Sequence, residues 1–182
     1  MASELFVDKL YPGPGSTSIE LSATSSISFK TNGSTQLTID SSGRLLYPNR
    51  PFFYARTGRG GDGYTSDPFL FNDVIHNVGG HFVTSGAGAY SRFIAPVSGL
   101  YAFQAAPGYK QTNLDWVCRV KVNSSFYAEI GRMIGTPLNS HSTIGGSITL
   151  KLNANDYVDL SPDGTTYHLN ATLNYFTGYL LG

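Results

Sequence analysis

The chain has 182 residues, of which 41% are hydrophobic, so it is long enough and apolar enough to form a packed core. Its 12 basic and 12 acidic side chains give a formal net charge of zero, and only 13% of the residues are charged. Without a charged field to attract nucleic acid or an anionic lipid surface, we expect neither partner. No apolar run approaches the ~18 residues of a membrane span, so we expect no membrane insertion.

Residues 1–15 contain one apolar pair, Leu5 and Phe6, and end in alternating proline and glycine from Pro12 to Gly15. Neither a helix nor a central strand accommodates that ending. The segment also lacks the basic and apolar regions of a secretory signal, so we expect synthesis in the cytoplasm. We interpret residues 1–15 as an arm that docks on other proteins of a larger particle.

Residues 16–50 contain the short alternating segments SIELSA, SISFKT, QLTID and RLLY, separated by SS, NGS and SSG turns. This pattern predicts a β-rich region of short strands. Each strand has too few apolar residues to form a core alone, whereas identical chains wound about one threefold axis would cover them. We therefore expect a trimeric shaft; the alternative is a small sheet folded against the C-terminal domain. The apolar positions are Ile19, Leu21, Ile27, Phe29, Leu37, Ile39 and Leu45.

The segment LTIDSSGRLLYPN, residues 37–49, resembles a turn that recurs in tail-fibre and other appendage proteins of bacteriophages. In those proteins an Ile-Asp-Ser-Ser-Gly segment commonly precedes the distal part of the fibre. The residues fit a turn, because Asp40 can accept hydrogen bonds from the turn backbone and Gly43 can adopt a positive φ. The resemblance implies a protein of a phage appendage.

A second domain is expected from Pro51 to Gly182, because Pro51 forces the preceding residue to be extended and a more aromatic sequence follows. Roughly eight to ten strands bounded by Asn, Gly, Asp or Pro follow, without an amphipathic helix. Among them the segment FIAPVSGLYAF, Phe93 to Phe103, joins two alternating runs. Pro96 and Gly99 predict a hairpin-like corner there. We expect an all-β jelly-roll sandwich.

The first long loop of this domain, Thr57 to Asp67, contains four glycines and almost no apolar residue, which is typical of a surface loop. Arg59, Asp62 and Tyr64 in this loop are candidate contacts for a host-surface glycan. Polar and aromatic side chains of this kind suit sugar hydroxyls and stacking without much net charge. The alternative is a solvated loop that binds nothing.

Four segments of the second domain occur in a characteristic order: FNDVIHNVGGHFVTS, FIAPVSGLYAFQ, GGSITLKLNANDYVDL and NYFTGYLL. The series resembles the globular head of complement first-component q and its tumour-necrosis-factor-like relatives. The resemblance implies a ten-stranded jelly roll that forms a compact homotrimer, with the C-terminal strand near the threefold axis. Asn155 and Tyr157 depart from the family pattern, and no collagen-like stalk is present, which argues against a complement function.

Large apolar residues gather at the end of the chain, where a frayed terminus would not need them. We expect them to be buried within the sandwich or against neighbouring subunits. The candidates for the core or the trimer interface are Tyr101, Phe103, Tyr175, Phe176, Tyr179 and Leu181.

No residue pattern predicts catalysis, so we expect no enzyme and no cofactor. The histidines form no HxH or HExxH motif, and no GxSxG segment occurs. Asp159 and Asp163 could ligate calcium through their oxygens, but their spacing is also ordinary in turns, so no metal is expected. Cys118 is the only cysteine and its neighbours indicate a small core residue. The histidines are His76, His81, His141 and His168.

The expected function is that of a non-enzymatic structural protein of a bacteriophage virion. Its N-terminal arm would bind other virion proteins, and its knob would contact a host-surface glycan or another virion protein. The first alternative is a secreted or cell-surface lectin-like module of the same fold, which the missing secretory signal argues against. The second is a polysaccharide-cleaving tailspike, which the lack of a clear carboxylate pair argues against.

Overall fold

The computed structural model describes residues 9–10, 18–21, 26–58, 67–84, 91–110, 115–134, 141–161 and 174–182. The chain forms two compact units, Met1–Arg50 and Pro51–Gly182. Every regular element in the described ranges is a β-strand, so these ranges contain no helix that could cross a membrane.

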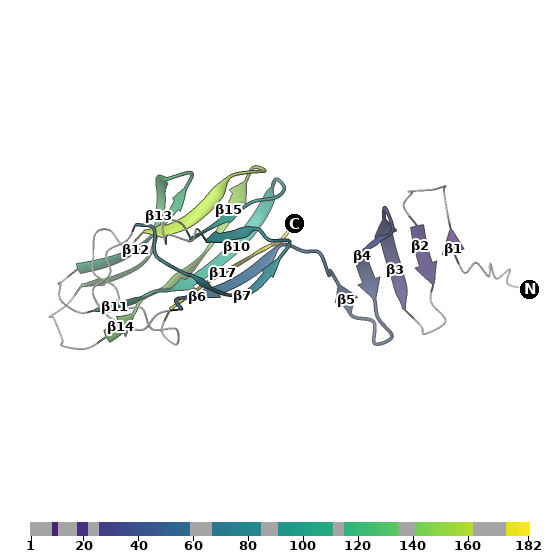
Figure 1. Ribbon diagram of the computed structural model, residues 1–182, viewed down its shortest axis with the longest axis horizontal. Coiled ribbons are helices and arrows are strands. Elements are labelled where there is room, and N and C mark those ends of the chain that lie inside the picture. Colours follow the sequence, from purple (N-terminus) through teal and green to yellow (C-terminus); the bar gives the residue numbers. More distant parts are fainter. Residues whose placement is uncertain are drawn as a thin grey trace, which may run out of the picture. The chain divides into compact units, whose positions relative to one another are not determined.

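The strands of the first unit are β1 Lys9–Leu10, β2 Ser18–Leu21, β3 Ile27–Thr31, β4 Ser34–Ile39 and β5 Leu45–Leu46. They form one antiparallel sheet in which each strand pairs with its sequence neighbour (Figure 1). Short alternating segments joined by polar turns favour such a meander. Asn32 and Gly33 between β3 and β4 both have positive φ, 49° and 76°, as a tight hairpin turn requires.

The turn between β4 and β5 is held together by Asp40. Its Oδ1 accepts hydrogen bonds from the amides of Ser42 and Arg44, both at 2.9 Å, and its Oδ2 accepts one from Arg44 Nε at 2.7 Å. Hydrogen bonding from the backbone and side chain of Arg44 holds the pKa of Asp40 below its ordinary value. Gly43 has a φ of 76°. The Ile-Asp-Ser-Ser-Gly motif is therefore a turn that supplies its own hydrogen bonds.

The described residues of the second unit form two five-stranded sheets and a two-stranded sheet, with all pairs antiparallel. The first sheet, here called the β17 sheet, has the order β15 Gly146–Leu152, β10 Gly99–Ala106, β17 Tyr175–Leu180, β6 Phe52–Arg56 and β7 Asp73–Val78. The second, the β12 sheet, has the order β13 Ser125–Ile134, β12 Asp115–Val122, β16 Tyr157–Ser161, β9 Ser91–Ile94 and β8 Phe82–Thr84. β11 Gly108–Lys110 pairs with β14 His141–Thr143 (Figure 1). The ten strands of the larger sheets confirm the predicted jelly-roll sandwich.

Aromatic side chains fill the space between the two large sheets. Phe53 stacks on Phe82 with ring centroids 4.5 Å apart and meets Phe176 edge-on at 4.9 Å. Phe93 of β9 and Phe103 of β10 meet across the sheets at 5.6 Å. Such pairs contribute about 0.5–1.5 kcal/mol each beyond the burial of their surface. The inward faces of both sheets are therefore fixed by ring packing.

The segment Phe93–Phe103 crosses from one sheet to the other. β9 pairs with β8 and β16, whereas β10 pairs with β15 and β17, so the two strands do not pair with each other. The predicted hairpin-like corner was wrong in this respect, because proline and glycine mark a change of direction without saying which strand is the next neighbour. The hydroxyl of Tyr101 donates a hydrogen bond to the Val97 carbonyl at 2.7 Å and ties this crossing to the core.

Two consecutive glycines precede the inward-packed part of β15. A Cβ atom at Gly145 would overlap the carbonyl oxygen of Ala105, and one at Gly146 would overlap the carbonyl oxygen of Ile130. Both obstacles are backbone atoms, which cannot rotate away as a side chain can. The Gly-Gly pair therefore allows β10, β13 and β15 to approach one another closely.

We predict that Gly145→Ala destabilises the second unit by about 3 kcal/mol or more, because backbone must move to admit the methyl group. Urea unfolding followed by tryptophan fluorescence measures the loss. The matched control is Gly182→Ala, since no atom lies within 4 Å of a Cβ at that position. Equal stability of the two variants would contradict the close approach.

Candidate functional site

The outward surface of the three central strands of the β17 sheet is rich in tyrosine, and Arg56 at the end of β6 is its one charged side chain. Burial alternates along its strands: Phe53, Phe176 and Gly178 are buried, and their neighbours face outward and are partly exposed. We call the outward residues of the three central strands the tyrosine face. They are Leu100, Ala102, Gln104 and Ala106 of β10, Tyr175, Thr177 and Tyr179 of β17, and Phe52, Tyr54 and Arg56 of β6.

Ring contacts order the tyrosine face. The rings of Tyr54 and Tyr175 stack with centroids 6.1 Å apart. Thr177 between the two tyrosines of β17 donates its hydroxyl hydrogen to the Phe53 carbonyl at 2.6 Å. The one ion pair described at the end of β6 joins Arg56 to Asp73 at 2.8 Å. The centre of the face therefore presents fixed rings and neutral polar groups.

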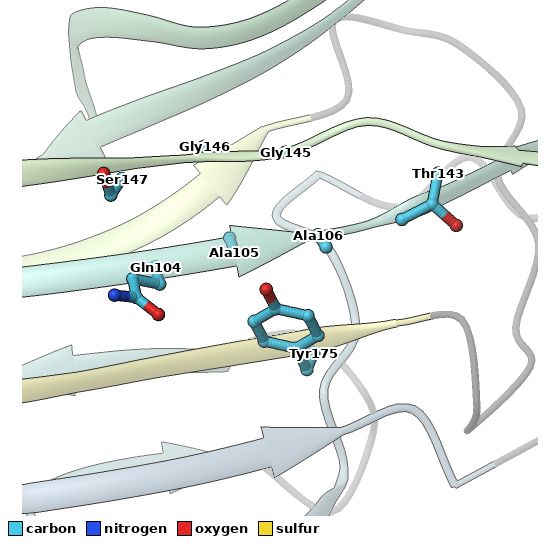
Figure 2. Close-up of a pocket in the computed structure, with 8 residues that line it drawn as sticks. All are labelled: Gln104, Ala105, Ala106, Thr143, Gly145, Gly146, Ser147 and Tyr175. Atoms are coloured by element: carbon cyan, nitrogen blue, oxygen red, sulfur yellow. The ribbon is translucent and has the colours of Figure 1, made fainter.

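A shallow groove of about 360 Å³ lies at one end of this face. Gln104 of β10 and Tyr175 of β17 border it from neighbouring strands, and Ser147 borders it from β15 (Figure 2). The groove exists because several of its lining residues are small, including the Gly145–Gly146 pair. None of the described residues that line the groove is charged, so these residues suit a neutral polar or apolar group.

The predicted core and interface residues divide between the two sides of the β17 sheet. Tyr101, Phe103 and Phe176 are at most 1% exposed and lie in the core. Tyr175 and Tyr179 lie on the tyrosine face, half-buried. Leu181 follows β17 and is 41% exposed, while its amide donates to the Leu100 carbonyl at 2.7 Å.

Phe52 and Tyr54 belong to the tyrosine face but were not singled out from the sequence. The segment PFFYAR predicts a strand whose side chains alternate between two faces. A run of aromatic residues at successive positions does not show which of them face the core. In the structure Phe53 is buried, so Phe52 and Tyr54 on either side of it face outward.

The candidate glycan contacts Arg59, Asp62 and Tyr64 lie outside the described residues, and the structure does not test them. Asp163 and His168 also lie outside them. Within the described ranges, no group of three or more potential metal ligands occurs. Asp156 accepts hydrogen bonds from Asn123 Nδ2 and the Asn153 amide, both at 2.8 Å.

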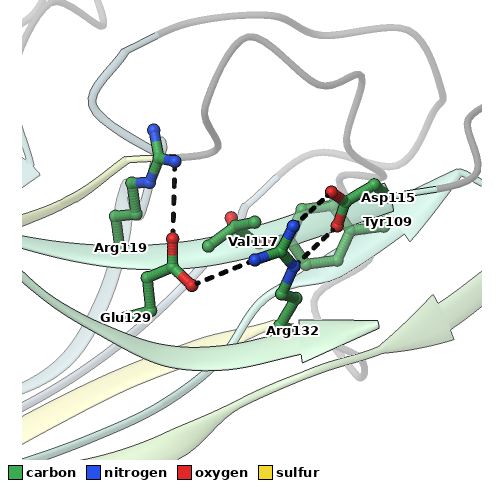
Figure 3. Close-up of polar contacts among 6 residues, drawn as sticks. All are labelled: Tyr109, Asp115, Val117, Arg119, Glu129 and Arg132. Carbon is green, nitrogen blue, oxygen red and sulfur yellow. Dashed lines mark hydrogen bonds and ion pairs between the residues drawn. The ribbon is translucent and has the colours of Figure 1, made fainter. Parts of the chain in front are cut away.

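The outer side of the β12 sheet carries a chain of ion pairs. Arg132 binds Asp115 through two hydrogen bonds of 3.0 and 2.6 Å, and lies 3.9 Å from a Glu129 oxygen (Figure 3). Arg119 donates to the other Glu129 oxygen at 3.4 Å. Hydrogen bonding from Arg132 lowers the pKa of Asp115. These exposed pairs join side chains of β12 and β13 and contribute little stability each.

Cys118 is buried in the core, as its neighbours predicted, and burial raises the pKa of its thiol to about 12. A thiol of this kind is not a nucleophile at neutral pH. Neither Cys118 nor the ion pairs of the β12 sheet form a catalytic arrangement.

Asp159 on β16 is a buried carboxyl group, 3% exposed, whose Oδ1 has no hydrogen-bond partner in the described structure. Lys121 lies opposite it in the β12–β16 register, but the Lys121 ammonium binds the Asp67 carboxylate at 2.8 and 2.9 Å. Burial raises the pKa of Asp159 to about 6, against the opposing effect of the Lys121 and Arg92 charges. The ionised group therefore opposes folding.

We predict that Asp159→Asn stabilises the protein at pH 7.5 by about 1 to 2 kcal/mol, a value reduced for solvent screening. The folded-state pKa of about 6 lies above the ordinary 3.8, so the cost of ionisation is absent below about pH 4 and complete above pH 6. Urea unfolding at pH 4 and at pH 7.5 measures the change in the free energy of unfolding. Asp115→Asn is the control, and should destabilise because the pKa of Asp115 is lowered. A gain for Asp159→Asn that is the same at pH 4 would contradict the explanation.

Comparison with known proteins identifies the second unit. The family model of the C1q domain matches residues 52–181. Among curated proteins, none matches the chain.

Solved structures give a consistent result. The globular domain of zebrafish complement 1qA protein matches with a TM-score of 0.56 and 18% identity, covering 72% of this chain and 98% of that one. Eiger TNF from S. frugiperda matches with a TM-score of 0.59 and 10% identity, covering 74% and 94%. Murine APRIL matches with a TM-score of 0.54 and 8% identity, covering 72% and 99%. Identities this low show a shared fold and no more.

Proposed function

Because this chain belongs to the C1q domain family, we propose that it is a homotrimeric, non-enzymatic binding protein and forms a fibre-like appendage of a bacteriophage virion. Domains of the C1q and tumour-necrosis-factor type typically form homotrimers and act as binding modules. The tyrosine face is the observation that carries the proposal. Its rings are held in place, its centre is uncharged, and it belongs to the sheet that contains the C-terminal strand β17.

A trimer interface explains why the centre of the tyrosine face carries aromatic rings and no charge. Interfaces are enriched in tyrosine and depleted of charge at their centres. In a cyclic trimer the residues nearest the threefold axis meet their own copies, so a charged residue there would place like charges together. The neutral groove beside Tyr175 could then receive a side chain of the adjacent subunit.

The appendage role is supported by the first unit. The turn held by Asp40 has the sequence that recurs in phage fibres, and the turn's hydrogen bonds show why Asp and Gly occupy their positions. In this proposal, residues 1–15 bind other virion proteins and the polar loops of the knob bind a host-surface glycan.

Tyr175→Glu is predicted to weaken trimer formation at least 100-fold, or about 3 kcal/mol, because three carboxylates would be desolvated together. Light scattering coupled to gel filtration should give three times the chain mass of 19.6 kDa for the native protein and a lower mass for the variant. The control is Tyr127→Glu, since Tyr127 is 58% exposed on the other sheet. If Tyr175→Glu remains as trimeric as the control, the tyrosine face is not the interface.

For ligand binding, the double variant Asp62→Ala, Tyr64→Ala should reduce adsorption of the full-length trimer to a panel of bacterial cells about 10-fold, or 1.4 kcal/mol, through lost stacking and hydrogen bonds to sugar. Flow cytometry with labelled protein measures it. Tyr127→Ala is the matched control on an exposed tyrosine of the knob. Unchanged adsorption of the double variant would make the loop a plain surface loop.

A further inference from the structure

The outer surface of β12 and β13 carries one aromatic ring beside a chain of charged side chains. Trp116, Cys118 and Val120 of β12 are buried, so the positions that alternate with them face outward. Residues paired directly across antiparallel strands lie on the same face, which places Glu129 beside Arg119. We call the five outward residues that contact one another the outer row. They are Asp115, Arg119, Phe126, Glu129 and Arg132.

Each member of the outer row is held in place by its neighbour. Arg132 links the carboxylates of Asp115 and Glu129, and Arg119 binds the other oxygen of Glu129 (Figure 3). The guanidinium carbon of Arg119 also lies 5.6 Å from the centroid of the Phe126 ring. The ring and the polar groups therefore form one continuous array with fixed positions.

The outer row is ordered and yet accessible to a ligand. Phe126 is 61% exposed, and the four charged side chains are 31% to 50% exposed. Exposed ion pairs add little to stability, and a ring that projects into water gains little from burial. Folding alone therefore gives no reason for this combination, whereas binding benefits from polar groups that are already oriented.

The charges of the outer row balance. Two guanidinium groups face two carboxylates, and the neighbouring Lys121 is paired with Asp67 at 2.8 Å. A balanced array of donors and acceptors is complementary to hydroxyl groups, which both donate and accept hydrogen bonds. An anionic or cationic ligand would meet a like charge beside each opposite one.

We propose that the outer row binds a neutral linear polysaccharide. The face of the Phe126 ring would stack on the C–H groups of one sugar, while the charged side chains bind hydroxyl groups of the next sugars. The six residue steps from Phe126 to Arg132 cover roughly 20 Å at about 3.4 Å each. A row of this length on an open sheet suits an extended chain, whereas a single sugar needs an enclosing pocket.

This inference rests on the proposed function, in which the knob binds a glycan, and assigns that binding to β12 and β13. The outer row lies on the β12 sheet, and the tyrosine face lies on the β17 sheet. A polysaccharide on the outer row would therefore not compete with the proposed trimer interface.

Binding of the full-length chain to an array of neutral and acidic bacterial surface polysaccharides tests the proposal. The native protein should bind neutral polysaccharides. Phe126→Ala should weaken this binding at least ~10-fold through lost stacking, and Glu129→Gln about 5-fold because an amide replaces the carboxylate acceptor. Both side chains are exposed, so gel filtration should show the native assembly for each variant.

Tyr47→Ala is the matched control, because Arg50 also lies over the Tyr47 ring, at 4.3 Å, but this pair belongs to the first unit. If both outer-row variants bind as tightly as this control, the outer row is not the site, while glycan binding elsewhere on the knob stands. Binding to acidic polysaccharides alone would overturn the neutral ligand class. If the native chain binds no polysaccharide of the array, the outer-row site and the proposed glycan binding both fail.

Discussion

The packing of aromatic rings between the two large sheets is the constraint on which the rest of the second unit depends. Gly178 leaves room on β17 for the rings of Phe53 and Phe103, and Phe176 beside it is fully buried. Because side chains alternate along a strand, these inward positions fix Tyr175 and Tyr179 on the outer surface. A slip of one residue would exchange core and surface. The tyrosine face is thus a consequence of the core.

Local chemistry made much of this fold predictable. The Asn32–Gly33 turn, the Asp40 turn and the alternation of the strands are all readable in single segments. The sheet crossing at Pro96 and the burial of Asp159 were not, since both depend on segments distant in sequence. The candidate site was predictable in part. β17 was identified by its terminal aromatic cluster. The contribution of β6 was not predicted, because its aromatic residues are adjacent in the sequence and the sequence does not show which of them face outward.

The two units differ in how far each covers its own side chains. The second unit has its own core and one outer face with little charge, whereas none of residues 26–50 of the first unit is buried. Threefold assembly, as proposed, would cover the outer face of the second unit. The zero net charge of the chain is consistent with surfaces that meet copies of themselves.

Self-assembly is the central claim, and sedimentation equilibrium of the native full-length chain tests it most directly. At micromolar concentrations and neutral pH, the account predicts a single species of three times 19.6 kDa whose mass does not change on tenfold dilution. A stable monomer over that range would contradict it. The low charge of the tyrosine face would then need another explanation.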